Sequence, residues 1–172
     1  MKRIIAILVL LSMGSMFSAC NIGSMLPNGT YTAGGRHHLL RNAFTVKGNK
    51  INVSYTEQSR CGQGWTDRFG GTGVPYDWWA DCSLDITEVY EFKIKGNEIM
   101  LTFYSGKAEM ADLTVGGPRA RGPENFVDVH ERWARSLNEG FNSRMNGQEI
   151  FLPFERKSDR SFFIQNIQYT RE

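Results

Sequence analysis

The sequence predicts a mainly β protein: an antiparallel up-and-down barrel or a strongly curved sheet, with one amphipathic helix. Two similar segments, 44–55 and 92–103, alternate apolar with mostly polar residues on both sides of a Lys-Gly-Asn turn. Such alternation around a Gly/Asn turn is typical of a β-hairpin that buries one face. One stretch, from Pro123 to about Asn138, instead repeats apolar residues at helical spacing. The paired hairpin segments indicate one sheet system rather than a solenoid.

The expected strands follow the chain from an opening strand at 29–32 through the two hairpins to the C-terminus. Pro153 lies in the polar register of a late segment, which favours an edge strand because proline cannot donate a ladder hydrogen bond. The late strands carry two apolar sets, one at Ile150, Leu152 and Phe154, and the other in a last strand through Phe163, Ile167 and Tyr169. The hairpins are expected to turn these residues inward: Phe44, Val46, Ile51, Val53 and Tyr55, then Phe92, Ile94, Ile99, Leu101 and Phe103.

The expected helix spans about 124–138. Pro123 suits its first turn, and Gly140 lies just past its expected end. Charged residues, among them Asp128 and Glu131, occupy one side. The other side is apolar at spacings of three and four: Phe126, Val129, Trp133 and Leu137. We expect this apolar stripe to pack against the sheet or to cover one end of a barrel.

A family resemblance follows from the strand pattern. The opening Gly29-Thr30-Tyr31 and the repeated aromatic-x-apolar-Lys-Gly-Asn-x-apolar-x-apolar pattern are similar to small secreted bacterial proteins of the lipocalin-like (calycin-type) group. The resemblance covers about half of the chain that follows residue 19. It implies that successive hairpins close into a barrel, with a tendency to bind small ligands or proteins. The excursion from Glu57 to Asp81 and the helical segment depart from that pattern. The sequence therefore does not decide whether the barrel closes.

The N-terminus has the pattern of a secretory signal. Lys2 and Arg3 precede an unbroken apolar run at 4–11, and small or weakly polar residues lead to Cys20. The run is too short for a permanent membrane-spanning helix, which needs about 20 apolar residues. A cysteine directly after small residues resembles the signal of bacterial lipoproteins, which implies cleavage before Cys20 and acylation of that residue. An ordinary cleaved signal is the alternative.

Cleavage at this point predicts three parts: the signal at 1–19, a lipidated tether at 20–27 and one β-rich domain at 28–172. The lipoprotein resemblance implies the bacterial cell envelope, with anchoring to a membrane through the lipid on Cys20. Asn21 follows that cysteine where Asp would favour the inner membrane, so we expect the outer membrane, facing the periplasm. Of the 20 basic residues, two are lost with the signal, which leaves 18 against 18 acidic residues. A neutral domain has no overall field to attract nucleic acid, and we expect none as a partner.

The remaining cysteines predict a disulfide. If Cys20 carries lipid, Cys61 and Cys82 form an even pair in an oxidising compartment. Closing a loop of about 22 residues stabilises the fold by roughly 3 kcal/mol in the chain-entropy description. A pair of metal-binding thiolates is the alternative, although neither cysteine lies in a Cys-x-x-Cys motif.

The stretch between these cysteines supplies the candidate binding surface. It mixes glycines with five aromatic residues: Trp65, Phe69, Tyr76, Trp78 and Trp79. Three uses stay open for the aromatic rings. They could anchor a protein interface, in which tryptophan and tyrosine are enriched. They could stack on saccharide rings, with carboxylates nearby to accept hydroxyl groups. As a third use, Trp78 and Trp79 could close the end of the barrel as part of the core.

No catalytic signature is present. His37 and His38 are adjacent, so a strand would point them to opposite faces, and we expect surface histidines rather than metal ligands. His130 lies between Asp128 and Glu131 on the expected helix, a pattern typical of a solvated face. The sequence therefore predicts a non-enzymatic protein without metal or cofactor.

Its expected role is a lipid-anchored binding module for a protein partner in the envelope, such as an inhibitor, an immunity factor or an accessory subunit. The alternatives are a lipocalin-like binder of a glycan or small apolar ligand, and an envelope enzyme.

Overall fold

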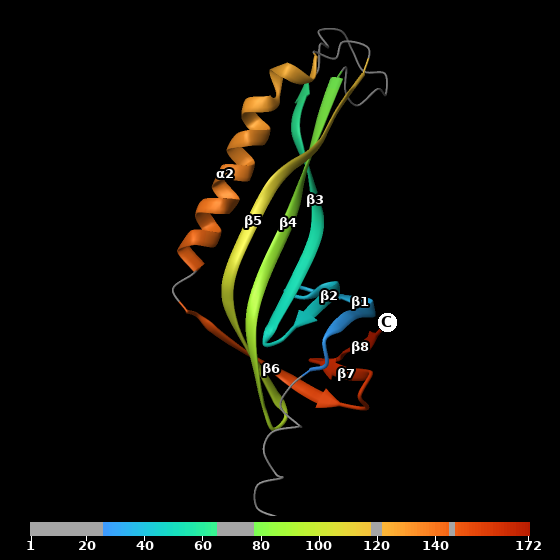
Figure 1. The fold of residues 1–172 in the computed structure, drawn as a ribbon. Coiled ribbons are helices and arrows are strands. Elements are labelled where there is room, and N and C mark those ends of the chain that lie inside the picture. Colours follow the sequence, from blue (N-terminus) through green and yellow to red (C-terminus); the bar gives the residue numbers. More distant parts are fainter. Residues whose placement is uncertain (1–25, 65–77, 118–121, 145–146) are drawn as a thin grey trace, which may run out of the picture.

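The computed structural model describes residues 26–64, 78–117, 122–144 and 147–172. Eight strands follow one another in chain order, each antiparallel to its neighbours, and the first pairs with the last, so that the sheet closes in a ring (Figure 1). The predicted up-and-down barrel is confirmed, and the open question of its closure is answered. The strands are β1 (Gly29–His37), β2 (Arg41–Lys47), β3 (Lys50–Gly64), β4 (Trp78–Lys95), β5 (Glu98–Gly116), β6 (Glu149–Arg156), β7 (Ser161–Ile164) and β8 (Ile167–Arg171).

Unequal strand lengths divide the sheet into a barrel and an extension. β2 pairs with β3 over three residues and β6 pairs with β5 over five, all near the β2–β3 and β4–β5 turns. The other ladders of β3, β4 and β5 continue as far as Gly64, Trp78 and Gly116. These three strands therefore rise beyond the ring, as Figure 1 shows. We call residues 54–64, 78–88 and 104–116 the extension, and its far end the tip.

The opposite end of the molecule, which we call the base, holds the start of the described chain. Leu26 is buried in the core, and the hydroxyl of Tyr31 donates to the carbonyl of Pro27 at 2.8 Å. The side chain of Asn28 accepts a hydrogen bond from Gly48 in the β2–β3 turn at 2.8 Å. The β4–β5 turn also lies at this end. The chain thus enters the domain at the base, at the far end from the tip.

The barrel core follows from the alternation of the strands. All ten residues expected to face inward are buried, except that Tyr55 is only partly buried. Aromatic rings fill the interior, with centroids 4.9–6.3 Å apart. These rings belong to Tyr31, Phe44, Phe154, Phe162 and Tyr169. At this level the barrel interior is therefore filled by side chains and is not an open space.

The C-terminal strands differ from the expectation. The expected last strand is two strands, β7 and β8, because the chain reverses at Gln165, where φ is 53°. The reversal buries Phe162 and Ile164, whereas Phe163 is only partly buried. A shift of one residue moves a strand's apolar set to its other face, which explains the error.

Pro153 does not mark an edge, because β6 lies between β5 and β7. Its carbonyl accepts from Gln165 at 2.7 Å, at the turn where the β6–β7 ladder ends. A missing N–H at that point removes no ladder hydrogen bond, so the proline is tolerated inside a closed sheet.

The helical segment consists of a short 3₁₀ turn, η1 (Pro123–Asn125), and α2 (Val127–Arg144). Helix α2 runs along the extension, mostly against β5 (Figure 1). The side chain of Asn138 donates to the Ala108 carbonyl and accepts from the Ala108 amide, both at 2.9 Å. The ring of Phe141 packs on Phe103 with centroids 6.0 Å apart. The helix therefore covers the inner face of the extension, which continues the barrel interior.

The predicted helix is confirmed, but its bounds differ, because Gly140 lies inside α2 and not past its end. Of the expected apolar stripe, Phe126 is buried, and Trp133 and Leu137 are partly buried against the core. The fully buried residues of α2 are His130, Ala134 and Phe141. A glycine inside a helix costs about 1 kcal/mol relative to alanine, less than burial of the Phe141 ring returns. That packing explains why the helix continues to Arg144. Within the described residues, neither helical segment is long and apolar enough to cross a membrane.

Candidate functional site

The two tryptophans that begin β4 lie on opposite faces of the extension. Adjacent residues of a strand point to opposite sides. Trp78 faces α2, with its ring 5.4 Å from that of Phe126, and Trp79 faces outward beside Asp81. The other three residues of the candidate surface, Trp65, Phe69 and Tyr76, lie outside the described residues. The expected excursion from Glu57 to Asp81 is strand wherever it is described, because β3 continues to Gly64 and β4 begins at Trp78.

Trp78 holds the beginning of the helical segment against the tip. A Cβ added at Gly62 would lie 2.7 Å from the Phe126 ring and 3.1 Å from the ring of Trp78. Glycine on β3 thus makes room for two aromatic rings that clamp α2 onto the sheet. Trp78 is therefore part of the packing between the sheet and the helical segment. This corresponds to the use of the aromatic residues as part of the core.

Trp79 lies over β5 on the outer face. A Cβ added at Gly116 would lie 2.4 Å from Cζ2 of the Trp79 ring, so the indole rests directly on that backbone. The guanidinium of Arg60 lies 5.5 Å from the ring centroid. Trp79 is half-buried, which leaves part of its ring accessible beside a charged group.

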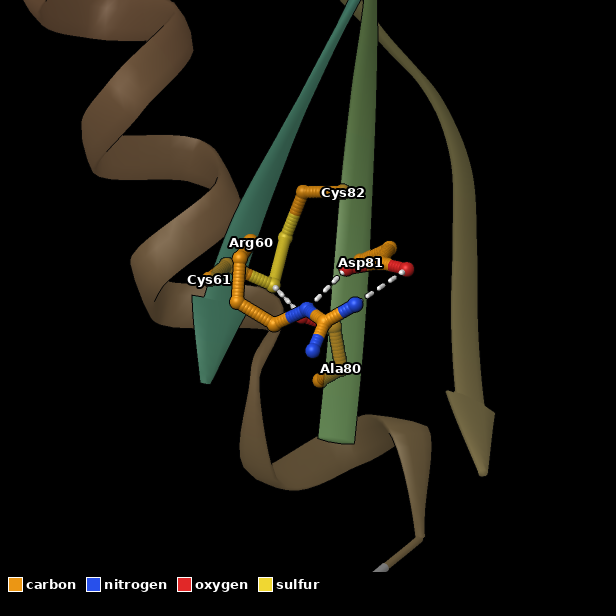
Figure 2. A network of polar contacts seen from close by, with 5 residues as sticks. All are labelled: Arg60, Cys61, Ala80, Asp81 and Cys82. Carbon is orange, nitrogen blue, oxygen red and sulfur yellow. Dashed lines mark hydrogen bonds and ion pairs between the residues drawn. A yellow bond between two sulfur atoms is a disulfide. The ribbon is translucent and has the colours of Figure 1, made fainter. Parts of the chain in front are cut away.

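Arg60 and Asp81 face each other across β3 and β4. The Nε of Arg60 lies 2.5 Å from Oδ1 of Asp81, and Nη2 lies 3.3 Å from Oδ2 (Figure 2). About 40% of each side chain remains exposed. An exposed pair of this kind contributes about 0–1 kcal/mol to stability, so its main effect is to fix the orientation of the guanidinium beside Trp79.

The disulfide lies next to this ion pair. Cys61 and Cys82 are bonded, with Cα atoms 5.8 Å apart, so the predicted pairing is the one observed. The β3–β4 ladder shifts between Arg60 and Gly62, which makes Cys61 the extra residue of a β-bulge. Figure 2 shows the bridge and the ion pair side by side. The covalent bond thus fixes the bulge that positions Arg60.

A hollow of about 200 Å³ opens on the outer face, and we call it the tip hollow. Ser83 shapes one side, because its Oγ accepts from the Asp112 amide at 2.8 Å and donates to the Asp112 carbonyl at 3.1 Å. The hollow is lined by Gln58, Trp79, Asp81, Cys82, Ser83, Asp112 and Thr114. Sites for drug-sized ligands measure about 300–1,000 Å³. The tip hollow is therefore large enough for one side chain or one sugar ring.

The sequence pattern did not identify several residues of the tip hollow. Gln58 lies on β3, whereas Asp112 and Thr114 lie two residues apart on β5, and only the register of the long ladders brings the two strands' residues to one hollow. The alternation of polar residues over 54–60 was visible, and it indicates an exposed face. Which residue of β5 lies opposite depends on ladder shifts between Cys82 and Leu84.

The histidines are not surface residues as expected, apart from His38. His37 and His130 are 1% and 3% exposed. The Nε2 of His130 lies 2.6 Å from the Ser83 carbonyl, so the imidazole joins α2 to β4. The flanking Asp128 and Glu131 are exposed, as expected. Burial of a histidine on a helix is possible here because the sheet offers its ring an acceptor.

His37 and His38 also do not point to opposite faces. Their ring centroids lie 4.5 Å apart, because β1 ends at His37 and His38 begins a turn. The Nδ1 of His37 accepts from the amides of Leu39 and Leu40 at 3.2 Å, and Nε2 pairs with the Gln165 side chain at 2.9 Å. Both ring nitrogens are thus used within the fold. No cluster of three or more His, Cys, Asp or Glu residues that could hold a metal occurs in the described ranges.

No protein-family model, no curated protein and no solved structure matches the chain. The chemistry of the tip is therefore inferred from the geometry of its residues.

Proposed function

We propose that the protein is a lipid-anchored envelope protein that binds a protein partner non-covalently through the outer face of its tip. The observation that carries this proposal is the separation of the two ends. The chain enters the domain at the base, where Asn28 contacts Gly48, and the tip hollow lies on the extension, between Ser83 and the tip. β4 runs from the tip to the base with 18 residues, a path of about 60 Å at roughly 3.3 Å per residue.

An acyl chain on Cys20 would orient the domain relative to the membrane. Leu26 is buried in the core and Pro27 contacts Tyr31, so the tether is shorter than expected: residues 20–25 would connect the lipid to the base over at most about 22 Å when fully extended. The base would then stay near the membrane while the tip stands away from it. Confinement to the membrane surface raises the effective concentration of the tip toward other envelope components. Stable anchoring needs two or more lipid chains, which the lipoprotein resemblance implies.

The tip hollow suggests the chemistry of the partner. Its indole wall, Trp79, resembles the aromatic anchors that dominate protein interfaces. Asp112 is exposed at its edge, while Asp81 already has a partner in Arg60. A lysine or arginine of the partner could contact the face of Trp79 and the carboxylate of Asp112 together. We therefore propose a basic side chain as the group that enters the tip hollow.

A sugar ring is the second candidate for the same hollow. The flat apolar face of a saccharide stacks on an indole, and Gln58 and Asp112 could bind its hydroxyls. The barrel interior is a poorer place for a small apolar ligand, because five aromatic rings with centroids 4.9–6.3 Å apart fill it. The aromatic filling therefore favours binding on the outside of the sheet.

A photo-crosslinking experiment in intact cells tests this proposal. A photoreactive residue is placed at Gln58 in the tip hollow or, as the matched control, at Lys93, which is exposed near the base on the same strand system. We expect a discrete protein adduct from position 58 that is absent from position 93 and is lost in the Trp79→Ala background. Identical adducts from both positions, or no protein adduct from position 58, would contradict a protein partner at the tip. An adduct that survives Trp79→Ala would contradict Trp79 as its anchor.

A further inference from the structure

A second hollow lies at the rim of the barrel, where β1 separates from β2. Their ladder passes from the pair Thr32–Ala43 directly to the pair His37–Arg41. Residues 33–36 therefore have no partners in β2. The space beside them measures about 420 Å³, and we call it the rim hollow. It is lined by Gly34, Gly35, Arg36, Arg41, Asn42 and Tyr55, among others.

The fold holds Arg41 in an unfavourable backbone conformation at this place. Its φ is 56°, in the left-handed region that costs a non-glycine residue about 1–3 kcal/mol. Two contacts maintain it. The hydroxyl of Tyr169 donates to the Arg41 carbonyl at 2.9 Å, and the preceding turn is bonded to the buried ring of His37. The side chain of Arg41 is thus fixed by the scaffold at the wall of the rim hollow.

The guanidinium of Arg41 has unused hydrogen-bonding capacity. Its Cζ lies 3.9 Å from the centroid of the Tyr55 ring, which supports one face of the group. Its Nε is buried and has no hydrogen-bond partner within the described structure. A buried donor without an acceptor costs about 1–3 kcal/mol. Because this atom is enclosed by the fold, a group in the rim hollow would meet the other parts of the Arg41 side chain, which lines the hollow.

The neighbouring carboxylate, Glu88, is bonded to other groups and forms no ion pair with Arg41. Glu88 is 6% exposed, and its oxygens accept from the hydroxyls of Tyr55, at 2.8 Å, and Tyr90. Burial raises the pKa of both hydroxyls, which therefore stay protonated as donors to Glu88. In the described part of the chain, neither Arg36 nor Arg41 forms an ion pair. The rim hollow is therefore lined by two guanidinium groups that have no carboxylate at ion-pair distance among the described residues.

The two glycines carry the second observation. Neither Gly34 nor Gly35 has a positive φ, and a Cβ at Gly34 would meet nothing within 4 Å. Neither backbone conformation nor packing within the chain requires glycine at position 34. Glycine in a strand often marks a place where a ligand approaches the backbone closely. On the other side of these glycines lies a hollow of about 580 Å³, lined by Thr32, Asn166, Ile167 and Gln168 among others.

We propose that the rim hollow binds the oxyanion of a small organic ligand, either a carboxylate or a phosphate group. The guanidinium groups of Arg36 and Arg41, both of which line the hollow, neutralise the oxyanion and donate hydrogen bonds to its oxygens. The remainder of the ligand passes over Gly34 and Gly35 into the hollow beside Gln168. This site is separate from the tip hollow, and its test is independent of any protein partner.

The test is a titration of the full-length protein in detergent, labelled with ¹⁵N-glycine and followed by NMR. The probes are citrate for the carboxylate, inorganic phosphate and glycerol 3-phosphate for the phosphate group, and glycerol as the neutral control, all at constant ionic strength. We expect saturable shifts of the Gly34 and Gly35 amides with citrate or with the phosphates, and none with glycerol. Gly48 and Gly96, in turns at the base, should not move. Equal shifts of all four glycines, or no shift of Gly34 and Gly35 with any probe, would overturn the proposal.

Three variants make the test specific. Gly34→Val should abolish the saturable shift of Gly35 without lowering the unfolding temperature, because valine suits a strand and meets open space. Arg36→Gln, at an exposed residue, should raise the dissociation constant at least tenfold. Arg132→Gln removes the same charge from the exposed face of α2 and should have no effect. Unchanged affinity in both Gly34→Val and Arg36→Gln, or an equal loss in Arg132→Gln, would contradict a site at the rim.

Discussion

Trp78 and Trp79 are neighbours in sequence, yet they lie on opposite faces of β4. The ring of Trp78 packs 5.4 Å from Phe126, while the ring of Trp79 rests on Gly116 at the outer face. Their substitutions should therefore have different consequences. Trp78→Ala should lower the free energy of unfolding by about 2 kcal/mol, less than the 3–5 kcal/mol of a fully buried tryptophan. Trp79→Ala should lower it by about 1 kcal/mol or less.

Urea denaturation with the disulfide intact measures both effects, and the crosslink from position 58 measures binding. Trp79→Ala should remove the crosslink while the domain stays folded. Trp78→Ala should preserve it under conditions where the protein is folded. Equal losses of stability in the two variants would show that the two faces do not have separate roles.

The disulfide should stabilise the extension. Joint replacement by Cys61→Ser and Cys82→Ser should lower the free energy of unfolding by roughly 3 kcal/mol, because the open chain regains the entropy of its loop. The unfolded, non-reduced wild-type protein should show no reactive thiol at either position. Quantitative labelling of both cysteines in that sample would exclude the bridge in the cellular protein.

The sequence predicted the barrel more completely than the site, and particular residues show why. Local alternation is enough to predict which residues of a strand face inward, because it is a property of neighbouring residues along that strand. This holds for Phe44, Val46, Ile51 and Val53. The tip hollow instead depends on pairing between distant segments. Thr114 reaches Asp81 only through two ladder shifts in the β4–β5 pair, at Cys82 and at Val89. Bulges of this kind leave no reliable local pattern.

Buried polar residues were the other source of error. His130 lies between Asp128 and Glu131, a pattern typical of a solvated face, whereas Glu88 is a carboxylate in the inward register of β4, between Ile86 and Tyr90. Each is buried because a distant group satisfies it: the Ser83 carbonyl for His130 and two tyrosine hydroxyls for Glu88. Only tertiary contacts determine whether a polar group is satisfied, so a single sequence gives little warning of them.

Lipidation of Cys20 is tested by a single substitution. Cys20→Ser should release the protein from the membrane fraction, because the thiol that would receive the lipid is gone and no described helix can span a membrane. Fractionation followed by immunoblotting measures the effect, and Cys61→Ser serves as the control for loss of a cysteine. Retention of the Cys20→Ser protein in the membrane fraction would refute the anchor.

The buried ring of His37 should make stability depend on pH. Burial, and next the positive charge that His38 can carry, lower the pKa of His37 below its usual value of 6.5, while the hydrogen bond with Gln165 opposes this. The neutral ring accepts from the amides of Leu39 and Leu40, which a protonated Nδ1 cannot do. The unfolded state binds the proton more readily, so the contribution of His37 is complete above pH 6.5 and is lost as the pH falls through the lower pKa of the folded state.

Urea denaturation between pH 7.5 and pH 5 measures this dependence above the range in which most carboxylates titrate. The wild-type free energy of unfolding should fall across this interval, and His37→Gln should be less stable at pH 7.5 but show a flatter profile. His38→Gln should keep most of the wild-type slope, because His38 is exposed. Parallel profiles for the wild type and His37→Gln would mean that another group causes the loss, and that the turn before Arg41 does not depend on a neutral His37.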